Sequence, residues 1–214
     1  WSDRVIELLS SSSSSENITL ILKGAAEISL TYPPLIEKCL SLISSDAIQS
    51  YDITQLASIM HSLAKLDYYD ADFMPLCLSE LKRDMKINSA DPHDLSSILW
   101  SCAKLKYQDS DFALRWFEVA AFKISSFSTE DLRQSIQGVA TLREFNEYFM
   151  NLWIDRVKEL GVRSFESITK LNNAYYLSML KLNSAGEDFK LVLDNIIVDL
   201  IQSVSENDLE NVED

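Results

Sequence analysis

Glycine and proline are scarce in this chain, with four residues of each among 214. Strands joined by tight turns need such residues repeatedly, and no alternation of apolar and polar residues bounded by turn dipeptides occurs. Apolar residues still make up 47% of the sequence, which is enough to bury a continuous core. The composition therefore favours an all-α protein.

Residues that commonly carry catalysis or bind metals are also few, at three cysteines and two histidines. The cysteines form no Cys-x-x-Cys pair and no Cys/His cluster with the spacing of a zinc site. Gly-rich phosphate loops, His-Glu-x-x-His and Gly-x-Ser-x-Gly are absent too. We therefore predict a protein that is not an enzyme, holds no metal or other cofactor, and keeps reduced cysteines in its core.

Long hydrophobic runs are missing as well. No segment approaches the roughly 18 apolar residues of a membrane span, and the first residues lack the basic, apolar and small-residue order of a signal peptide. We expect a soluble chain. It begins at Trp1 rather than Met, which is consistent with a processed product or one section of a longer solenoid.

What the sequence does contain is a repeat. The motif SIMHSLAKL at Ser58–Leu66 returns as SILWSCAKL at Ser97–Leu105. Anchored on the last leucine of this motif, five copies spaced by 37 to 40 residues span nearly the whole chain, with anchors at Ile28, Leu66, Leu105, Leu142 and Leu182. A period of this length is typical of stacked helical hairpins.

Each copy predicts two helices joined by a short turn. The first helix begins after an expected N-cap, and the five caps are Ser14, Asp52, Asp91, Ser128 and Ser167. A small residue four positions before most anchors lets a neighbouring helix approach closely, as at Gly24 and Ser101. The second helix carries an apolar pair four residues apart, at Leu35/Cys39, Phe73/Cys77, Phe112/Trp116, Phe149/Trp153 and Phe189/Leu193.

We therefore predict one all-α domain, an α-solenoid of about five helix-turn-helix repeats. Residues 1–9 are expected to be the end of a preceding helix, and 10–16 a serine-rich linker. The helical-repeat solenoid is expected over 17–204, and an acidic tail over 205–214.

Positive charge is in short supply, since the net charge is −14 and the isoelectric point is about 4.5. Half of that net charge lies in the segment Asp194–Asp214, which has seven acidic residues and no Lys or Arg. A negative body repels RNA at long range, because phosphate contacts supply most non-specific affinity.

The repeat nevertheless places basic and aromatic residues at matching positions. Lys65, Lys104 and Lys181 share one position, and Lys106 and Arg143 lie one residue past their anchors. Tyr68 and Tyr107 lie in matching turns, where they could stack on bases. Two alternatives stay open: solvated lysines that only complement helix dipoles, and tyrosines that fold back onto their hairpins.

The segment Asp94–Tyr107, DLSSILWSCAKLKY, resembles the first helix of octotricopeptide-type repeats and of the related repeats that precede RAP domains in FAST-kinase-like proteins. Asp52–Asp70 matches as well, with His61 in place of the tryptophan. The other copies match in spacing or apolar pattern, and no RAP domain is visible. The resemblance implies a nucleus-encoded protein of mitochondria, or alternatively plastids, that handles organellar RNA without a cofactor.

Taken together with the resemblance, the basic positions imply a non-catalytic protein that binds RNA or acts within a ribonucleoprotein such as the mitochondrial ribosome. Its expected RNA contacts are Lys65, Lys104, Lys106, Arg143, Lys181, Tyr68 and Tyr107. The acidic charge supports an alternative, a structural or adaptor subunit of a mitochondrial complex that binds protein partners along the solenoid face.

Overall fold

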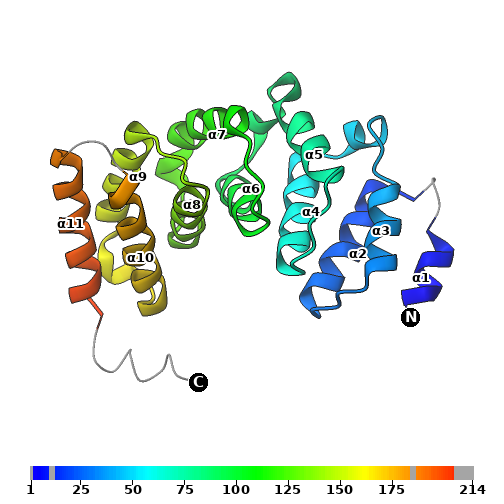
Figure 1. Cartoon of the computed structure of the whole chain (residues 1–214), viewed down its shortest axis with the longest axis horizontal. Helices are drawn as coiled ribbons and strands as arrows, with labels where there is room; N and C mark the ends of the chain where they lie inside the picture. The colour runs from blue at the N-terminus through cyan, green and yellow to red at the C-terminus, as the bar shows by residue number, and fades with distance from the viewer. Residues whose placement is uncertain (1, 10–12, 184–186, 205–214) are drawn as a thin grey trace. The chain divides into compact units, whose positions relative to one another are not determined.

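The computed structural model describes residues 2–9, 13–183 and 187–204, and within these ranges it contains helices and no strand. Helical hairpins recur along the chain, so the protein has the all-α, helical-repeat fold of an α-solenoid (Figure 1). The expected acidic tail, 205–214, lies outside the described residues.

The chain divides into two compact units, Trp1–Tyr107 and Gln108–Asp214, where the sequence alone suggested one domain. The boundary falls inside the third repeat, in the turn between its two helices. The two helices of the third repeat therefore belong to different units.

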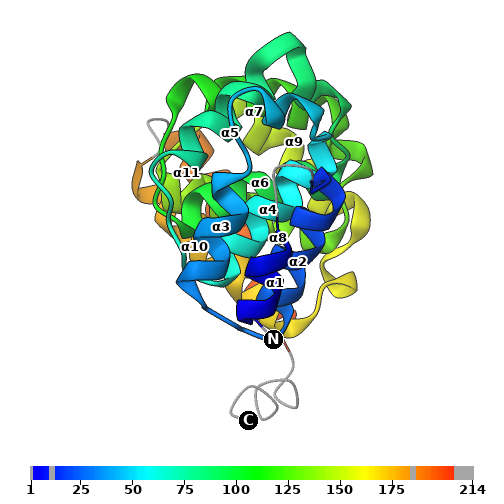
Figure 2. The same ribbon diagram turned by 90° about the vertical axis from the view of Figure 1, so that its right-hand side faces the viewer.

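The N-terminal unit holds six α-helices in its described residues. They are α1 (Ser2–Leu8), α2 (Ser15–Glu27), α3 (Pro33–Ser41), α4 (Ile53–Lys65), α5 (Phe73–Lys82) and α6 (Pro92–Lys104), with the 3₁₀ helices η1 (Ala47–Ser50) and η2 (Arg83–Ser89). The first helices α2, α4 and α6 pack side by side, and α1 packs mainly against α3 (Figure 2). Helix α2 starts inside the range that the sequence assigned to a linker.

The C-terminal unit holds the remaining described helices. They are α7 (Ser110–Lys123), α8 (Thr129–Leu142), α9 (Glu147–Leu160), α10 (Ser167–Asn183) and α11 (Glu187–Gln202), with the 3₁₀ helices η3 (Ile124–Ser126) and η4 (Val162–Ser164). Helix α10 lies between α8 and α11 and packs closely on both. The sequence did not predict the four 3₁₀ helices, which sit between successive hairpins.

Four of the five expected N-caps are confirmed. Each of them accepts a hydrogen bond from the backbone N–H three residues later, and they are Ser14, Asp52, Asp91 and Ser128. Asp52 and Ser128 form capping boxes. Ser167 is instead the first residue of α10, because the Lys170 N–H bonds the carbonyl of Glu166 at 3.0 Å and starts the helix one residue earlier.

A left-handed residue ends the first helix in four successive copies. The residue after each anchor has a positive φ near 55°, and these residues are Ser29, Asp67, Lys106 and Arg143, at 52°, 53°, 56° and 56°. In the first three copies the next N–H bonds a carbonyl five residues back, as from Tyr68 to Leu63 at 2.9 Å and from Tyr107 to Cys102 at 2.9 Å. These bonds have the Schellman pattern, so each helix ends in the same way.

The second-helix pairs form much of the core, as predicted. All ten of their residues are buried, including Cys39, Cys77, Trp116 and Trp153. The Trp153 indole N–H donates to the carbonyl of Leu132 at 3.1 Å and so joins α9 to α8. The anchor Ile28 differs from its counterparts Leu66 and Leu105, since it is exposed while they are buried.

None of the helices in the described residues is long and apolar enough to cross a membrane.

Candidate nucleic-acid interface on the first helices

Lys65 and Lys104 end two neighbouring helices, α4 and α6, and both side chains are exposed. The Lys65 ammonium donates to Glu27 Oε1 at 3.1 Å, and Glu27 fills the same repeat position in α2. The hydrogen bond from Lys65, and then its positive charge, lower the pKa of the Glu27 carboxyl. No described residue forms an ion pair with Lys104, so it is the more available cation of the two.

Lys106 and Arg143 are the left-handed residues that end α6 and α8. Their side chains are exposed, and they belong to different units. Their backbone N–H groups bond the carbonyls of Ala103 and Ala140 at 3.1 and 3.3 Å. Both residues therefore have a structural task at a helix end, in addition to any contact their charge makes.

Lys181 lies in the C-terminal unit and is bound to a carboxylate. Its ammonium donates to Asp194 Oδ1 at 2.5 Å and Oδ2 at 2.6 Å, which joins α10 to α11. The structure thus gives Lys181 a role inside the last hairpin that Lys104 does not have.

The two predicted tyrosines lie half-buried in their turns. The Tyr68 hydroxyl donates to Glu37 Oε1 at 3.5 Å, and burial, followed by the charges of Glu37 and Asp70, raises its pKa. The Tyr107 ring lies 6.3 Å from the ring of Tyr69, which is the most exposed of these aromatic residues. Tyr69 was not predicted, although it directly follows Tyr68 in the sequence.

A polar groove of about 280 Å³ lies over α2, α4 and α6 of the N-terminal unit. Its basic and imidazole side chains are Lys23, Lys65, His61 and His93. The hydroxyl groups of Thr54, Ser58, Ser62 and Ser97 also line it, together with the carboxylates of Glu27 and Asp94. The groove therefore offers both signs of charge and several hydrogen-bonding groups in one place.

A pair of stacked rings lies next to this groove. The His61 and Trp100 rings are 4.9 Å apart with an interplanar angle of 35°. The two residues occupy one repeat position, which Lys23 fills in α2, and Trp100 remains partly exposed. The sequence did contain a signal for this site, because three successive copies place a basic or aromatic residue at one repeat position, which is exposed at Lys23 and half-buried at His61 and Trp100.

Asp94 is the buried carboxylate of the groove. It accepts a hydrogen bond from the Thr54 hydroxyl at 2.7 Å, which joins α4 to α6. Burial raises the pKa of the Asp94 carboxyl, and the bond from Thr54 opposes part of that rise.

The three cysteines are core residues, as expected. Burial raises the pKa of the Cys39 thiol to about 11, and burial also raises the pKa of Cys77 strongly. Both thiols are thus protonated at neutral pH, which makes them poor nucleophiles. Within the described ranges, no three His, Cys, Asp or Glu side chains are grouped so as to hold a metal ion.

Comparison of the chain with protein-family models and with curated proteins finds no match.

Proposed function

We propose that this chain is a non-catalytic helical-repeat protein of mitochondria, or alternatively of plastids, that binds RNA or acts within a ribonucleoprotein such as the mitochondrial ribosome. The polar groove over α2, α4 and α6 is the surface we assign to RNA. The observation that carries the assignment is the combination of lysines, hydroxyl groups and stacked His61–Trp100 rings. The compartment rests on the resemblance to octotricopeptide-type repeats.

Single-stranded RNA suits the chemistry of this groove. Unstacked bases bind aromatic faces, and base edges bond hydroxyl and imidazole groups. Trp100, next to the groove, supplies a partly exposed ring, and Ser58 on the groove wall supplies a half-buried hydroxyl group. Tyr69 lies outside the groove, in the turn between α4 and α5, and supplies a second exposed ring. Lys23 and Lys104 are exposed at the same helices and supply positive charge for backbone phosphates.

The remaining predicted contacts differ in how readily they can reach RNA. Lys65 exchanges Glu27 for a phosphate at modest cost, because an exposed ion pair contributes only about 0–1 kcal/mol. Lys106 is exposed at the end of α6. Arg143 and Lys181 belong to the C-terminal unit and are proposed as secondary contacts.

The acidic charge sets the expected strength of binding. A chain with net charge −14 is not steered toward RNA at long range. Its affinity for RNA therefore depends on local contacts and on the other components of a ribonucleoprotein. We therefore expect weak binding to isolated RNA that salt weakens further.

The lysines are tested by charge reversal with a matched control. The groove variant combines Lys65→Glu, on the groove wall, with Lys104→Glu, at the end of α6. Lys158→Glu combined with Arg163→Glu makes the same change in charge at exposed residues elsewhere. Fluorescence anisotropy with single-stranded RNA should show lower affinity for the groove variant alone. Its salt slope should fall by about 0.7 per lost phosphate contact. Equal affinity of the two variants would remove these lysines from the interface.

The stacked rings are tested by Trp100→Ala. Loss of one base stack should weaken RNA binding by about 1–3 kcal/mol, with little change in the salt slope. Tyr148→Ala removes a well-exposed aromatic residue of α9 and serves as the control. If both variants bind RNA as the wild type does, the rings do not hold bases.

A second function is favoured by the ion pairs at Lys65 and Lys181. Because Glu27 and Asp194 already bind these cations, the chain can act as a structural or adaptor subunit that contacts proteins only. Recovery of the tagged chain from organelle extract, with and without nuclease, separates the two functions. Crosslinked RNA and nuclease-sensitive partners support RNA binding, whereas nuclease-resistant protein partners without RNA support the adaptor.

A further inference from the structure

An apolar groove of about 240 Å³, which we call the α3/α5 groove, lies at the second helices of the N-terminal unit. Its walls are the C-terminal half of α3, the residues that follow α3, and the start of α5. The apolar side chains on these walls are Leu40, Ile43, Phe73 and Leu76. Leu76 is half-buried, so the groove offers part of an aliphatic side chain to a ligand.

Three carboxylates line the same walls, and they belong to Glu37, Asp70 and Asp72. Glu37 and Asp72 are exposed, while Asp70 is half-buried and its Oδ1 accepts the Phe73 N–H at 2.7 Å. Burial raises the pKa of the Tyr68 hydroxyl, and the charges of Glu37 and Asp70 raise it further, so both carboxylates lie close to this side chain. No basic residue lines the groove, and no described residue forms an ion pair with its carboxylates.

The end of α3 adds to the negative potential of the groove. Leu40 and Ser41 lie in the last turn of α3, where the backbone carbonyls form the negative end of the helix dipole. The three carboxylates do not converge on one point, because no three His, Cys, Asp or Glu side chains in the described ranges are grouped so as to hold a metal ion. The walls therefore favour an extended cationic ligand over a single ion.

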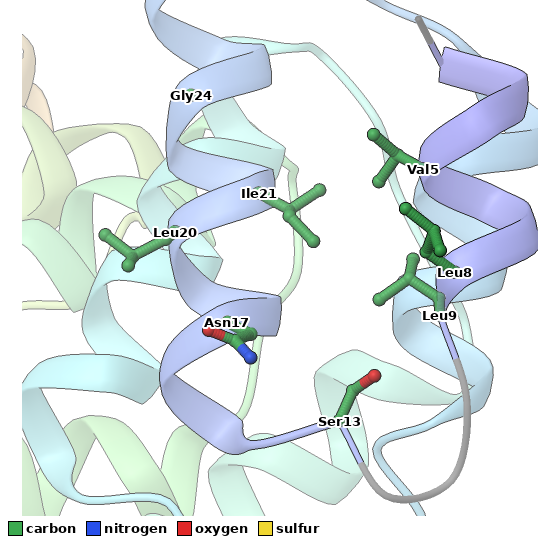
Figure 3. A pocket seen from close by; sticks show the side chains of 8 residues that line it. All are labelled: Val5, Leu8, Leu9, Ser13, Asn17, Leu20, Ile21 and Gly24. Atoms are coloured by element: carbon green, nitrogen blue, oxygen red, sulfur yellow. The ribbon is translucent and has the colours of Figure 1, made fainter.

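Another apolar groove, of about 430 Å³, shows why these charges matter. Val5, Leu8 and Leu9 of α1 face Ile21 of α2 across it (Figure 3). None of the described residues that line this larger groove carries a charge. Its lining therefore does not distinguish a basic ligand from an acidic one, whereas the lining of the α3/α5 groove does.

We propose that the α3/α5 groove binds an arginine-rich segment of a protein partner, in which arginine alternates with apolar side chains. A guanidinium is planar and bonds a carboxylate through two N–H groups at once, so it suits Glu37 and Asp72. Its aliphatic stem can pack on Leu76 while its charged head stays at the rim. The same carboxylates repel the phosphates of RNA, and a second copy of this chain has a net charge of −14.

The volume of the groove sets the size of what enters it. At about 240 Å³ it is smaller than the roughly 300–1,000 Å³ of a typical small-molecule pocket, so it takes one or two side chains of the segment. Exposed ion pairs are individually weak, and salt screens them, so binding should be weak and should weaken further with salt. The groove shares no residue with the polar groove over α2, α4 and α6, so this proposal does not depend on RNA binding.

The test uses a short fluorescein-labelled peptide that alternates arginine with leucine. Glu37→Lys combined with Asp72→Lys changes the groove, and Asp111→Lys combined with Asp155→Lys is the control. All four side chains are exposed, and Asp111 fills at α7 the repeat position that Asp72 fills at α5. Both double variants change the net charge by the same amount, so only the place of the change differs. Circular dichroism should show unchanged helix content in both.

Fluorescence anisotropy should show about tenfold weaker peptide binding by the groove variant, from the loss of two exposed ion pairs, and unchanged binding by the control. Leu76→Ser should weaken binding of this peptide by about threefold, but not binding of a peptide that alternates arginine with serine. A wild type that does not bind the arginine–leucine peptide overturns the proposal. Equal losses in the two double variants overturn it too, because the peptide would then bind to the acidity of the whole chain.

Discussion

Helices α2 and α10 are the first helices of the first and last hairpins, and they lie in different units. Helix α2 carries the apolar residue Leu20, which is more than half exposed. Helix α10 is covered by α11 and buries polar residues, including Lys170 and Asn173 at 6% and 0% exposure. A large apolar side chain is therefore exposed on α2, while polar side chains are buried on α10.

The difference shows that a covering helix allows its neighbour to bury polar side chains. The ammonium of Lys170 donates to the carbonyl of Ser203 at 3.1 Å, a partner that the C-terminal end of α11 brings within reach. A buried polar group needs such a partner, whereas an apolar group needs only cover. On α2, by contrast, Leu20 is an apolar side chain that no described residue covers fully.

Substitutions in α11, the helix that covers α10, give the largest expected changes in the free energy of unfolding. Leu193 is fully buried and Leu191 is mostly exposed in the same helix. Leu193→Ala should lower the free energy of unfolding by about 2–5 kcal/mol, because it leaves a cavity between α11 and its neighbours. Leu191→Ala should change it by less than about 0.5 kcal/mol. Urea unfolding followed by circular dichroism measures both, and equal effects would mean that α11 does not cover α10.

Substitution of Asn173, the buried amide of α10, gives the next largest expected change in stability. Both polar side-chain atoms of Asn173 are buried without a hydrogen-bond partner among the described residues. Asn173→Leu keeps the branched shape and removes the unsatisfied groups, so it should stabilise the chain by about 1–3 kcal/mol. Asn195→Leu, at an exposed position of α11, is the control and should have little effect. A destabilised Asn173→Leu variant would show that the amide is satisfied in solution, for instance by water.

Glycine substitution at the left-handed residues should stabilise the chain equally in both units. Lys106→Gly and Arg143→Gly should each stabilise the chain by about 1 kcal/mol, because glycine adopts positive φ without a steric penalty. Lys104→Gly, inside the last turn of α6, should destabilise it by a similar amount. Thermal melting of the three variants checks the signs, and a loss of stability in Lys106→Gly would contradict the left-handed assignment.

Asp94, at the interface between α4 and α6, gives the smallest expected change in stability, and this change depends on pH. Since burial raises the pKa of Asp94 in the folded state, the folded chain binds this proton more tightly than the unfolded chain. Its contribution to stability therefore falls as the pH rises above the ordinary carboxyl range near 4. Asp94→Asn should lack this decline, so melting temperatures of the two proteins should diverge between acidic and neutral pH. Parallel pH profiles would contradict the burial effect.

Much of the fold could be predicted because it follows from local patterns. N-caps such as Asp52 and apolar pairs such as Phe149/Trp153 are set by residues within one turn of helix. The second-helix caps Asp109 and Asn146 were missed, although both lie four residues after their anchors. The fifth copy was harder to predict, because α10 buries the charged residue Lys170 and only half-buries the neighbouring apolar residue Leu171.

The candidate site was predicted less well than the fold. Repetition places Lys65 and Lys104 on neighbouring helices, but it does not reveal that Glu27 binds one and not the other. Likewise, the stacking of His61 on Trp100 depends on the separation of α4 and α6, which no single helix determines. Contacts between copies of a repeat require the packed structure, whereas contacts within one copy do not.

The Schellman turns have a consequence for how the chain is made. The bonds that close the first three turns join residues only five apart, as from Tyr107 to Cys102. Such bonds form without waiting for distant segments, since closing a short loop costs little entropy. A hairpin emerging from the ribosome can therefore set its own reversal before the next one is synthesised, and the row of helices can grow in the order of translation.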